Sequence, residues 1–187
     1  MRCVVSAGRT RWGWHQLGSR WAAVLVADAR ICPGDLVLDV GAGTGALTEL
    51  LVACGAHVIA VELHPRRAAE LRRRFAEDHV TVVVADAADL RLPRRPFRVV
   101  ANPPFAIGVA LLRRLVAPGS RLVRADVVVP CHVAKRWTSG AAPGEGRWSS
   151  EFTAVVGRPL PRSAFSPPPP NGVAVLVIER RPHQIAR

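Results

Sequence analysis

Short apolar segments rich in valine alternate with helix-like segments along the first two thirds of the sequence, and this alternation constrains the fold most strongly. The strand-like segments cover residues 36–40, 57–61, 80–85, 97–101 and 122–129. The spacing of apolar residues predicts helices over residues 16–30, 45–54, 65–77 and 106–116. Strands that are apolar on both faces and separated by helices are typical of a parallel sheet covered on both sides. The sequence therefore predicts a doubly wound α/β fold.

The last third of the chain has a different pattern. A short helix is predicted over 131–138, followed by a Gly/Pro/Ser-rich loop and by two strands at 151–157 and 172–180. These two strands are separated by a proline-rich segment that contains no predicted helix, which favours an antiparallel pair at one edge of the sheet. We expect a basic N-terminal arm over residues 1–14 and a single domain over residues 15–187.

Composition narrows the class of protein. The 187 residues suffice for one domain, and no apolar run is long enough to span a membrane or to form a signal-peptide core. We therefore expect a cytoplasmic protein without a membrane partner. The formal charge of +12 favours binding to a polyanion, of which nucleic acid is the most common. The four cysteines are scattered, which predicts free, mostly buried thiols and no zinc site.

A glycine-rich turn follows the first strand of the sheet in the segment LVLDVGAGTGALTELL. Glycines at 41, 43 and 45 allow a tight turn and a close approach of the backbone to a ligand, and the next helix begins there with free N–H groups. Glu62 and Asp86 follow the second and third strands, so their carboxylates would lie along the same rim. Asp39, before the turn, either contacts a ligand or only caps the loop. The pattern resembles the seven-stranded, Rossmann-like S-adenosylmethionine-dependent methyltransferases, which implies that cofactor.

The segment NPPF places an amide, two prolines and an aromatic ring at the end of the fourth strand. The prolines fix φ and remove two N–H groups, so the corner is stiff and presents oxygen acceptors. The motif resembles the signature of amino-group methyltransferases, which implies that Asn102 and the Pro103 carbonyl accept the N–H groups of a target amine. Phe105 would then stack on a base turned out of its helix. Asn102 is neutral and cannot act as a strong base, so positioning must supply most of the catalysis.

The order and spacing of the motifs LDVGAGTGALT, VIAVELHP, VVVADAADL and VVANPPF resemble those of the Erm-type rRNA adenine N6-methyltransferases, relatives of the dimethyladenosine transferases of small-subunit rRNA. The resemblance implies cofactor contacts at Gly41, Gly43, Glu62, Asp86, Ala87 and Asn102. It also implies a second ring beside the target base from Phe165, in a late F-x-P-x-P motif. In this family a Gln-Asn-Phe-Leu segment closes over the cofactor, and the corresponding segment here is Trp14-His15-Gln16-Leu17. The resemblance therefore implies cofactor contacts at His15 and Leu17.

From this resemblance we expect methylation of adenine N6 in 23S rRNA, in the peptidyl-transferase loop, with resistance to macrolide-type antibiotics as the result. We also expect a monomer without a metal ion, in a short form that lacks the family's helical C-terminal domain. Arginines that would hold RNA lie at 2, 9 and 11, at 66 and 67, at 72–74, and at 113 and 114. Two alternatives remain open: methylation of another amino group, on a different RNA adenine or a protein glutamine, and a non-catalytic rRNA-binding assembly factor.

Overall fold

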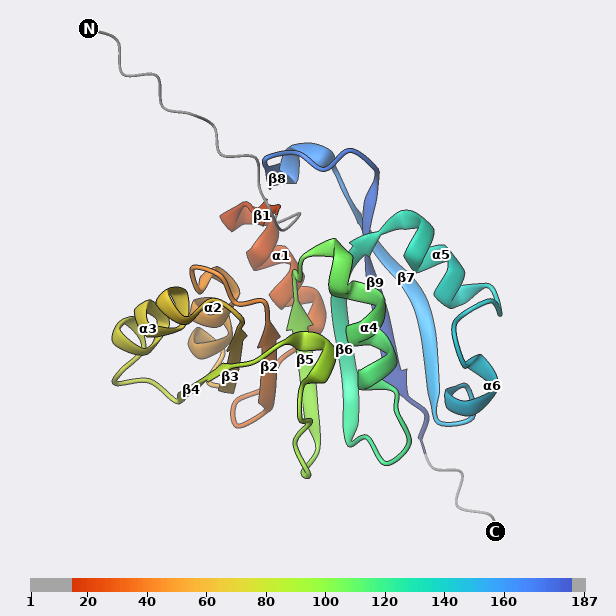
Figure 1. Cartoon of the computed structure of the whole chain (residues 1–187), viewed down its shortest axis with the longest axis horizontal. Helices are drawn as coiled ribbons and strands as arrows, with labels where there is room; N and C mark the ends of the chain where they lie inside the picture. The colour runs from red at the N-terminus through yellow and green to blue at the C-terminus, as the bar shows by residue number, and fades with distance from the viewer. Residues whose placement is uncertain (1–14, 183–187) are drawn as a thin grey trace, which may run out of the picture.

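The alternating strands form one sheet in the computed structural model, which describes residues 15–182 (Figure 1). Its seven strands lie in the order β4-β3-β2-β5-β6-β9-β7, and those from β4 to β6 run parallel. The strands are β2 (Leu36–Val40), β3 (His57–Glu62), β4 (Val80–Val84), β5 (Phe97–Ala101), β6 (Leu122–Pro130), β7 (Phe152–Leu160) and β9 (Val173–Arg180). β9 is antiparallel to both β6 and β7. The doubly wound fold and its antiparallel edge pair are confirmed.

Helices cover both faces of the sheet because successive strand residues point to opposite sides. In β2, Leu36 and Leu38 pack into the cluster under α4 and α5, whereas Val37 packs into the cluster under α1 and α2. The helices are α1 (Ser19–Ala29), α2 (Ala46–Ala53), α3 (Pro65–Arg74), α4 (Phe105–Leu115), α5 (Cys131–Thr138) and α6 (Glu145–Trp148). Two short 3₁₀ turns complete the set, η1 (Ala87–Asp89) and η2 (Arg162–Ala164). No helix among these is long and apolar enough to cross a membrane.

The N-terminal part of the predicted helix 16–30 is wrong. Gln16–Leu17 form the short strand β1, which pairs antiparallel with β8 (Phe165–Ser166). Gly18 has an extended backbone and donates its N–H to the Ala164 carbonyl at 2.8 Å, so α1 begins only after it. Figure 1 shows this pair above the edge at which the parallel strands end.

Three smaller expectations also change. The predicted loop after α5 contains the single-turn helix α6, whose Trp148 stacks on Trp137 with ring centroids 5.2 Å apart. β7 continues beyond residue 157 to Leu160, across a register shift. The thiols of Cys32, Cys54 and Cys131 are free, but Cys32 is exposed and the other two are only partly buried, so the expected burial is wrong.

The predicted basic arm, residues 1–14, lies outside the described residues.

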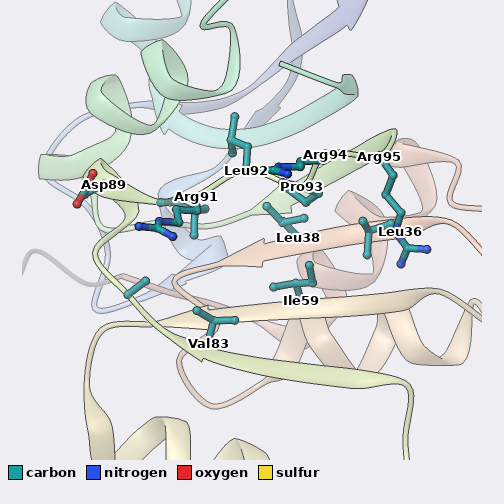
Figure 2. Close-up of a pocket in the computed structure, with 12 residues that line it drawn as sticks. Leu36, Leu38, Ile59, Val83, Asp89, Arg91, Leu92, Pro93, Arg94 and Arg95 are labelled. Carbon is teal, nitrogen blue, oxygen red and sulfur yellow. The ribbon is translucent and has the colours of Figure 1, made fainter. Parts of the chain in front are cut away.

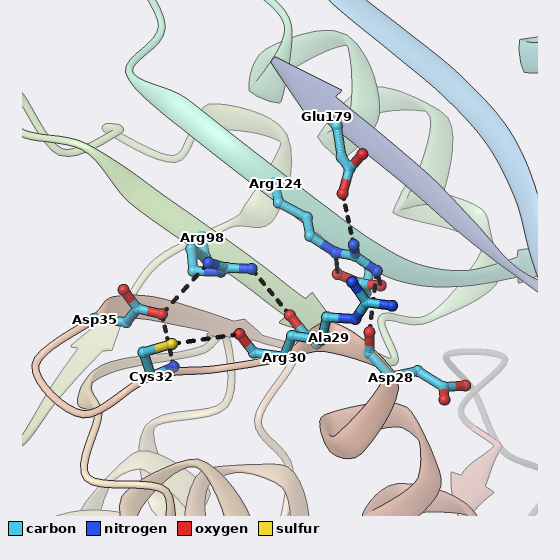
Figure 3. Close-up of polar contacts among 9 residues, drawn as sticks. Asp28, Ala29, Arg30, Cys32, Asp35, Arg98, Arg124 and Glu179 are labelled. Atoms are coloured by element: carbon cyan, nitrogen blue, oxygen red, sulfur yellow. Dashed lines mark hydrogen bonds and ion pairs between the residues drawn. The ribbon is translucent and has the colours of Figure 1, made fainter. Parts of the chain in front are cut away.

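A group of arginines ties α1 to the sheet (Figure 3). Arg124 of β6 binds both carboxylate oxygens of the buried Asp126 at 2.7 Å and donates to the Asp28 carbonyl at 3.1 Å. Arg98 of β5 donates to the Ala29 carbonyl at 2.9 Å. Both guanidinium groups thus meet carbonyls of the last turn of α1, where a positive charge stabilises a helix.

Candidate active site

The glycine-rich turn joins β2 to α2 and contacts the NPPF corner. Gly41 and Gly45 have φ angles of 79° and 87°, which a residue with a side chain rarely adopts. A Cβ at Gly41 would lie 3.3 Å from the Pro103 Cα atom, and one at Gly45 would lie 2.8 Å from the ring of Phe75. Glycine is therefore needed at both positions, and the turn and the corner pack together as the motifs predicted.

Glu62, at the end of β3, holds the turn through its carboxylate. Its two oxygens accept the N–H groups of Gly43 at 2.9 Å and of His64 at 2.8 Å. The side chain is buried, with only 5% of the residue exposed. Each carboxylate oxygen has a second lone pair, so both can still accept a hydroxyl group from a ligand. The carboxylate is thus held in a fixed position beside the turn.

Asp39 is fully buried beneath the turn. Its Oδ2 atom accepts the Thr48 hydroxyl at 2.7 Å, whereas its Oδ1 atom has no hydrogen-bond partner within the described part of the chain. Burial raises the pKa of Asp39 to about 7, although the Thr48 hydroxyl acts in the opposite direction. The carboxylate therefore caps the start of α2 and keeps one oxygen available. The sequence analysis missed Thr48, whose place in the first turn of α2 was the available signal.

Asn102 lies on the same side of the sheet as the turn. It lines a small cavity with Asp39, Gly41 and Gly43. Its Nδ2 atom donates to the His15 carbonyl at 2.8 Å, and its buried Oδ1 atom has no hydrogen-bond partner among residues 15–182. The side chain that lines this cavity thus carries a buried acceptor oxygen for which these residues supply no donor. No sequence pattern pointed to a backbone carbonyl as the partner of this amide.

The two rings predicted beside the base, Phe105 and Phe165, and the predicted cofactor contact Leu17 differ in exposure. Phe105 begins α4 and is partly buried, with its ring centroid 5.2 Å from that of His15. Leu17 and Phe165 face each other in the β1–β8 pair, are 5% and 4% exposed, and pack in the cluster under α1 and α2. In this structure the Phe165 ring therefore belongs to the core instead of presenting an open face.

Asp86 and Ala87 lie at the same edge of the sheet, after β4. Asp86 is exposed and accepts the Ala88 N–H at 2.8 Å, which starts η1, while Ala87 is buried. The exposed carboxylate is free to meet a ligand amino group. Among the residues described, no three His, Cys, Asp or Glu side chains converge in a way that could hold a metal ion.

A second cavity, of about 730 Å³, is separate from this site (Figure 2). It lies between residues 89–95 and the face of β2, β3 and β4, and side chains such as Leu38, Ile59 and Val83 point into it. Its lining is mostly aliphatic and includes neither the glycine-rich turn nor the NPPF corner. It offers none of the buried acceptors found above.

The polar groups at the carboxyl edge suit a nucleoside ligand that carries amino groups. The glycine-rich turn, a fixed carboxylate on Glu62 and two buried acceptors, on Asp39 and Asn102, lie in one region, and neither acceptor has a partner among the described residues. Buried acceptors of this kind are costly unless a ligand donates to them. The arrangement can therefore bind such a ligand and can orient an amino group, without a strong base.

A family model described as "Ribosomal RNA adenine dimethylase" matches residues 8–187. The chain is 40% identical over 151 residues to the mycinamicin-resistance protein MyrB of Micromonospora griseorubida, covering 78% of the chain and 47% of MyrB. It is 35% identical to an rRNA adenine N-6-methyltransferase of Corynebacterium diphtheriae, covering 77% of the chain and 57% of the relative. It is 34% identical to ribosomal RNA small subunit methyltransferase A of Thermosynechococcus vestitus, with 94% and 70% covered. The chain thus spans about half the length of the first two relatives.

Solved structures show the same fold. The 23S rRNA methyltransferase ErmE superposes with a TM-score of 0.75 at 26% identity, covering 87% of this chain and 68% of ErmE. A dimethyladenosine transferase from Plasmodium falciparum gives a TM-score of 0.76 at 22% identity, with 89% and 64% covered.

Proposed function

Because the chain belongs to the ribosomal RNA adenine dimethylase family, we propose that it transfers a methyl group to the N6 amino group of an adenine in rRNA. One observation of the structure supports this proposal most directly. Beside the glycine-rich turn, the Asn102 amide holds an acceptor oxygen to which no residue of the described part of the chain donates. An amino group that donates an N–H to this oxygen would lie next to the cofactor site.

S-adenosylmethionine is the cofactor, and when bound it supplies an activated methyl group on a sulfonium. The residues that would hold it are the ones that the sequence motifs selected at the carboxyl edge. They are His15, Leu17, Gly41, Gly43, Glu62, Asp86, Ala87 and Asn102. Glu62 suits the ribose hydroxyls because its carboxylate is fixed by two backbone N–H groups. Asp39 is an additional candidate acceptor for an ammonium group, since its Oδ1 atom is buried and has no partner among the described residues.

Asn102 orients the amino group of the target adenine. Its Oδ1 atom accepts one N–H, and the Pro103 carbonyl is the second acceptor, so the nitrogen lone pair turns out of conjugation with the ring. The new N–C bond replaces the S–C bond of the sulfonium, which leaves as a neutral thioether. The amide takes no proton, so the proton that the methylated nitrogen loses passes to water, and the rate enhancement comes from position and orientation. Phe105, with its ring partly exposed at the start of α4, stacks on the base.

We further propose that the target lies in the peptidyl-transferase loop of 23S rRNA and that the modification confers macrolide-type resistance. The 40% identity to a protein named for mycinamicin resistance supports this target, as does the similarity to ErmE. The charge of +12 supports an RNA substrate over a protein glutamine. The second candidate is an adenine of small-subunit rRNA, which is favoured by the relative that matches 94% of the chain.

A methyl-transfer assay on purified rRNA tests both targets. The protein is incubated with radiolabelled S-adenosylmethionine and either 23S or 16S rRNA, and the modified nucleotide is located by mass spectrometry of RNA fragments. We expect N6-methyladenine in the 23S loop and a loss of at least about a hundredfold in rate for Asn102→Ala. Label in 16S rRNA alone would reject the resistance target, and an Asn102→Ala variant as active as the original chain would reject the role of the amide. Asn171→Ala serves as the matched control because Asn171 is exposed.

A further inference from the structure

Three segments of the site meet at His15. Its backbone carbonyl accepts the Asn102 Nδ2–H group at 2.8 Å. Its ring lies 5.2 Å from that of Phe105, at an interplanar angle of 31°, and its Nδ1 atom lies 2.7 Å from the Pro167 carbonyl. One residue thus contacts the amide and the ring of the NPPF corner and the loop that follows β8.

The His15 carbonyl decides which way the Asn102 amide faces. A carbonyl oxygen can only accept, so the amide must present its NH₂ group to His15 and its Oδ1 atom to the site. If the amide were turned by 180°, two acceptor oxygens would face each other and the NH₂ group would point into the site. A site built that way would repel the amino group of a substrate instead of accepting its N–H.

The side chain of His15 holds this carbonyl in place. The Pro167 carbonyl also only accepts, so the proton must be on Nδ1, which donates across to the proline loop. The contact with Phe105 fixes the ring from a second direction. The short β1–β8 pair, with two residues on each strand, is the other tether of this segment.

We propose that His15 is a positioning residue for methyl transfer, which fixes the Asn102 amide with its oxygen toward the substrate amino group. This inference rests on the proposed function for its effect on rate. It extends that function by assigning His15 a role toward the target base, in addition to any contact with the cofactor. The role depends mainly on the hydrogen bond to Pro167, and the ring contact with Phe105 is the weaker of the two anchors.

Three variants separate these anchors. In His15→Asn the side-chain Nδ2 atom occupies the same place along the chain as Nδ1 of histidine, so the donor is kept and the ring is lost. In His15→Phe the ring is kept and the donor is lost. His15→Ala removes both. His57→Ala is the matched control, since His57 is an exposed histidine at the start of β3, at the opposite edge of the sheet.

The orientation of the amide can be observed without turnover. The chain contains only two asparagines, Asn102 and Asn171, so labelling with side-chain ¹⁵N-asparagine gives two NH₂ signals by NMR. We expect the Asn102 protons to exchange with solvent at least about tenfold more slowly than those of the exposed Asn171, because one is bonded to a carbonyl. In His15→Ala this difference should shrink to about threefold or less, while His57→Ala should leave it unchanged. Unchanged Asn102 signals in His15→Ala would overturn the proposal.

Kinetics then distinguish positioning from cofactor binding. At saturating S-adenosylmethionine, His15→Ala should lower kcat with rRNA by about tenfold to a hundredfold, an effect that a weaker Kd for the cofactor cannot produce. We expect His15→Asn to stay within about threefold of the original kcat and His15→Phe to lose about tenfold. An unchanged kcat at saturating S-adenosylmethionine in His15→Ala, with only the Kd for the cofactor raised, would overturn the proposal. An original chain that methylates no rRNA would reject the proposed function and would leave the NMR result to decide the orientation of the amide.

Discussion

Replacing Asp39 by asparagine should change how the stability of this protein depends on pH. Burial raises the pKa of Asp39 from 3.8 to about 7, so between these values the folded chain keeps a proton that the unfolded chain has released. The contribution of this group to the free energy of unfolding is fully present below about pH 4 and is lost as the pH rises to about 7. Above that pH, both states are ionised and the contribution stays constant.

The magnitude follows from the two pKa values. In the middle of this window the free energy of unfolding falls by about 1.4 kcal/mol for each pH unit, and this slope halves as the pH reaches the folded-state pKa, so the loss between pH 5 and pH 7 is about 2 kcal/mol. The asparagine variant has no proton to release, but its Oδ1 atom can still accept the Thr48 hydroxyl. Subtracting the two unfolding curves therefore isolates Asp39, because all other titrating groups are common to both chains.

Urea unfolding at pH 5, 6, 7 and 8, followed by tryptophan fluorescence, measures this difference. Trp137 and Trp148 are buried and stacked, so their emission reports the loss of the core. Asp89→Asn is the control, since Asp89 is exposed and its replacement should give a curve parallel to that of the original chain. A difference between Asp39→Asn and the original chain that is constant from pH 5 to pH 7 would refute the reasoning. Thr48→Val removes the hydroxyl that lowers the pKa, so the decline should continue to a higher pH.

Three further changes have defined outcomes. Glu62→Gln cannot accept from both backbone N–H groups that the acid now binds, so the affinity for S-adenosylmethionine should fall at least about tenfold by calorimetry; an unchanged Kd would remove Glu62 from the cofactor site. Gly45→Ala should lower the free energy of unfolding by about 2–4 kcal/mol, because the added Cβ would lie 2.8 Å from a ring carbon of Phe75. Gly119→Ala is the control: no atom lies within 4 Å of the added Cβ, so the loss should be only about 1 kcal/mol. Equal losses in urea unfolding would contradict that account. Arg124→Met leaves the buried Asp126 carboxylate without its guanidinium partner and should lower the free energy of unfolding by about 3–5 kcal/mol. Thermal unfolding at pH 7 measures this loss, and an unchanged Tm would show that the carboxylate does not need its partner.

The parts of the fold that sequence patterns predict are those in which local and long-range preferences agree. The apolar strands β2, β3 and β5 are buried on both faces, and only the interior of a covered sheet accommodates such segments. The neighbourhood of Gly41 and Asn102 follows from the same logic, since the carboxyl ends of adjacent parallel strands meet at one edge. The antiparallel pair was predictable because no helix separates its strands.

The remaining parts depend on contacts between distant residues. Gln16–Leu17 fit a helical spacing, yet they pair with Phe165–Ser166, about 150 positions away, and this pairing determines their conformation. The same pairing buries the Phe165 ring, which the motif alone placed beside a base. The bond from Asn102 to the His15 carbonyl has no side-chain signature at all, because any residue at position 15 has a carbonyl.

Because β9 lies between β6 and β7, the ribosome delivers the strands in an order that differs from their order in space. The nascent chain presents β6 and then β7 before the eight-residue strand that joins them has been made. Until then the valine-rich edge of β6 has unpaired N–H and C=O groups, which pair readily with the strands of other chains. Synthesis therefore passes through an aggregation-prone interval that ends when β9 emerges, and a pause or truncation before Val173 would prolong it.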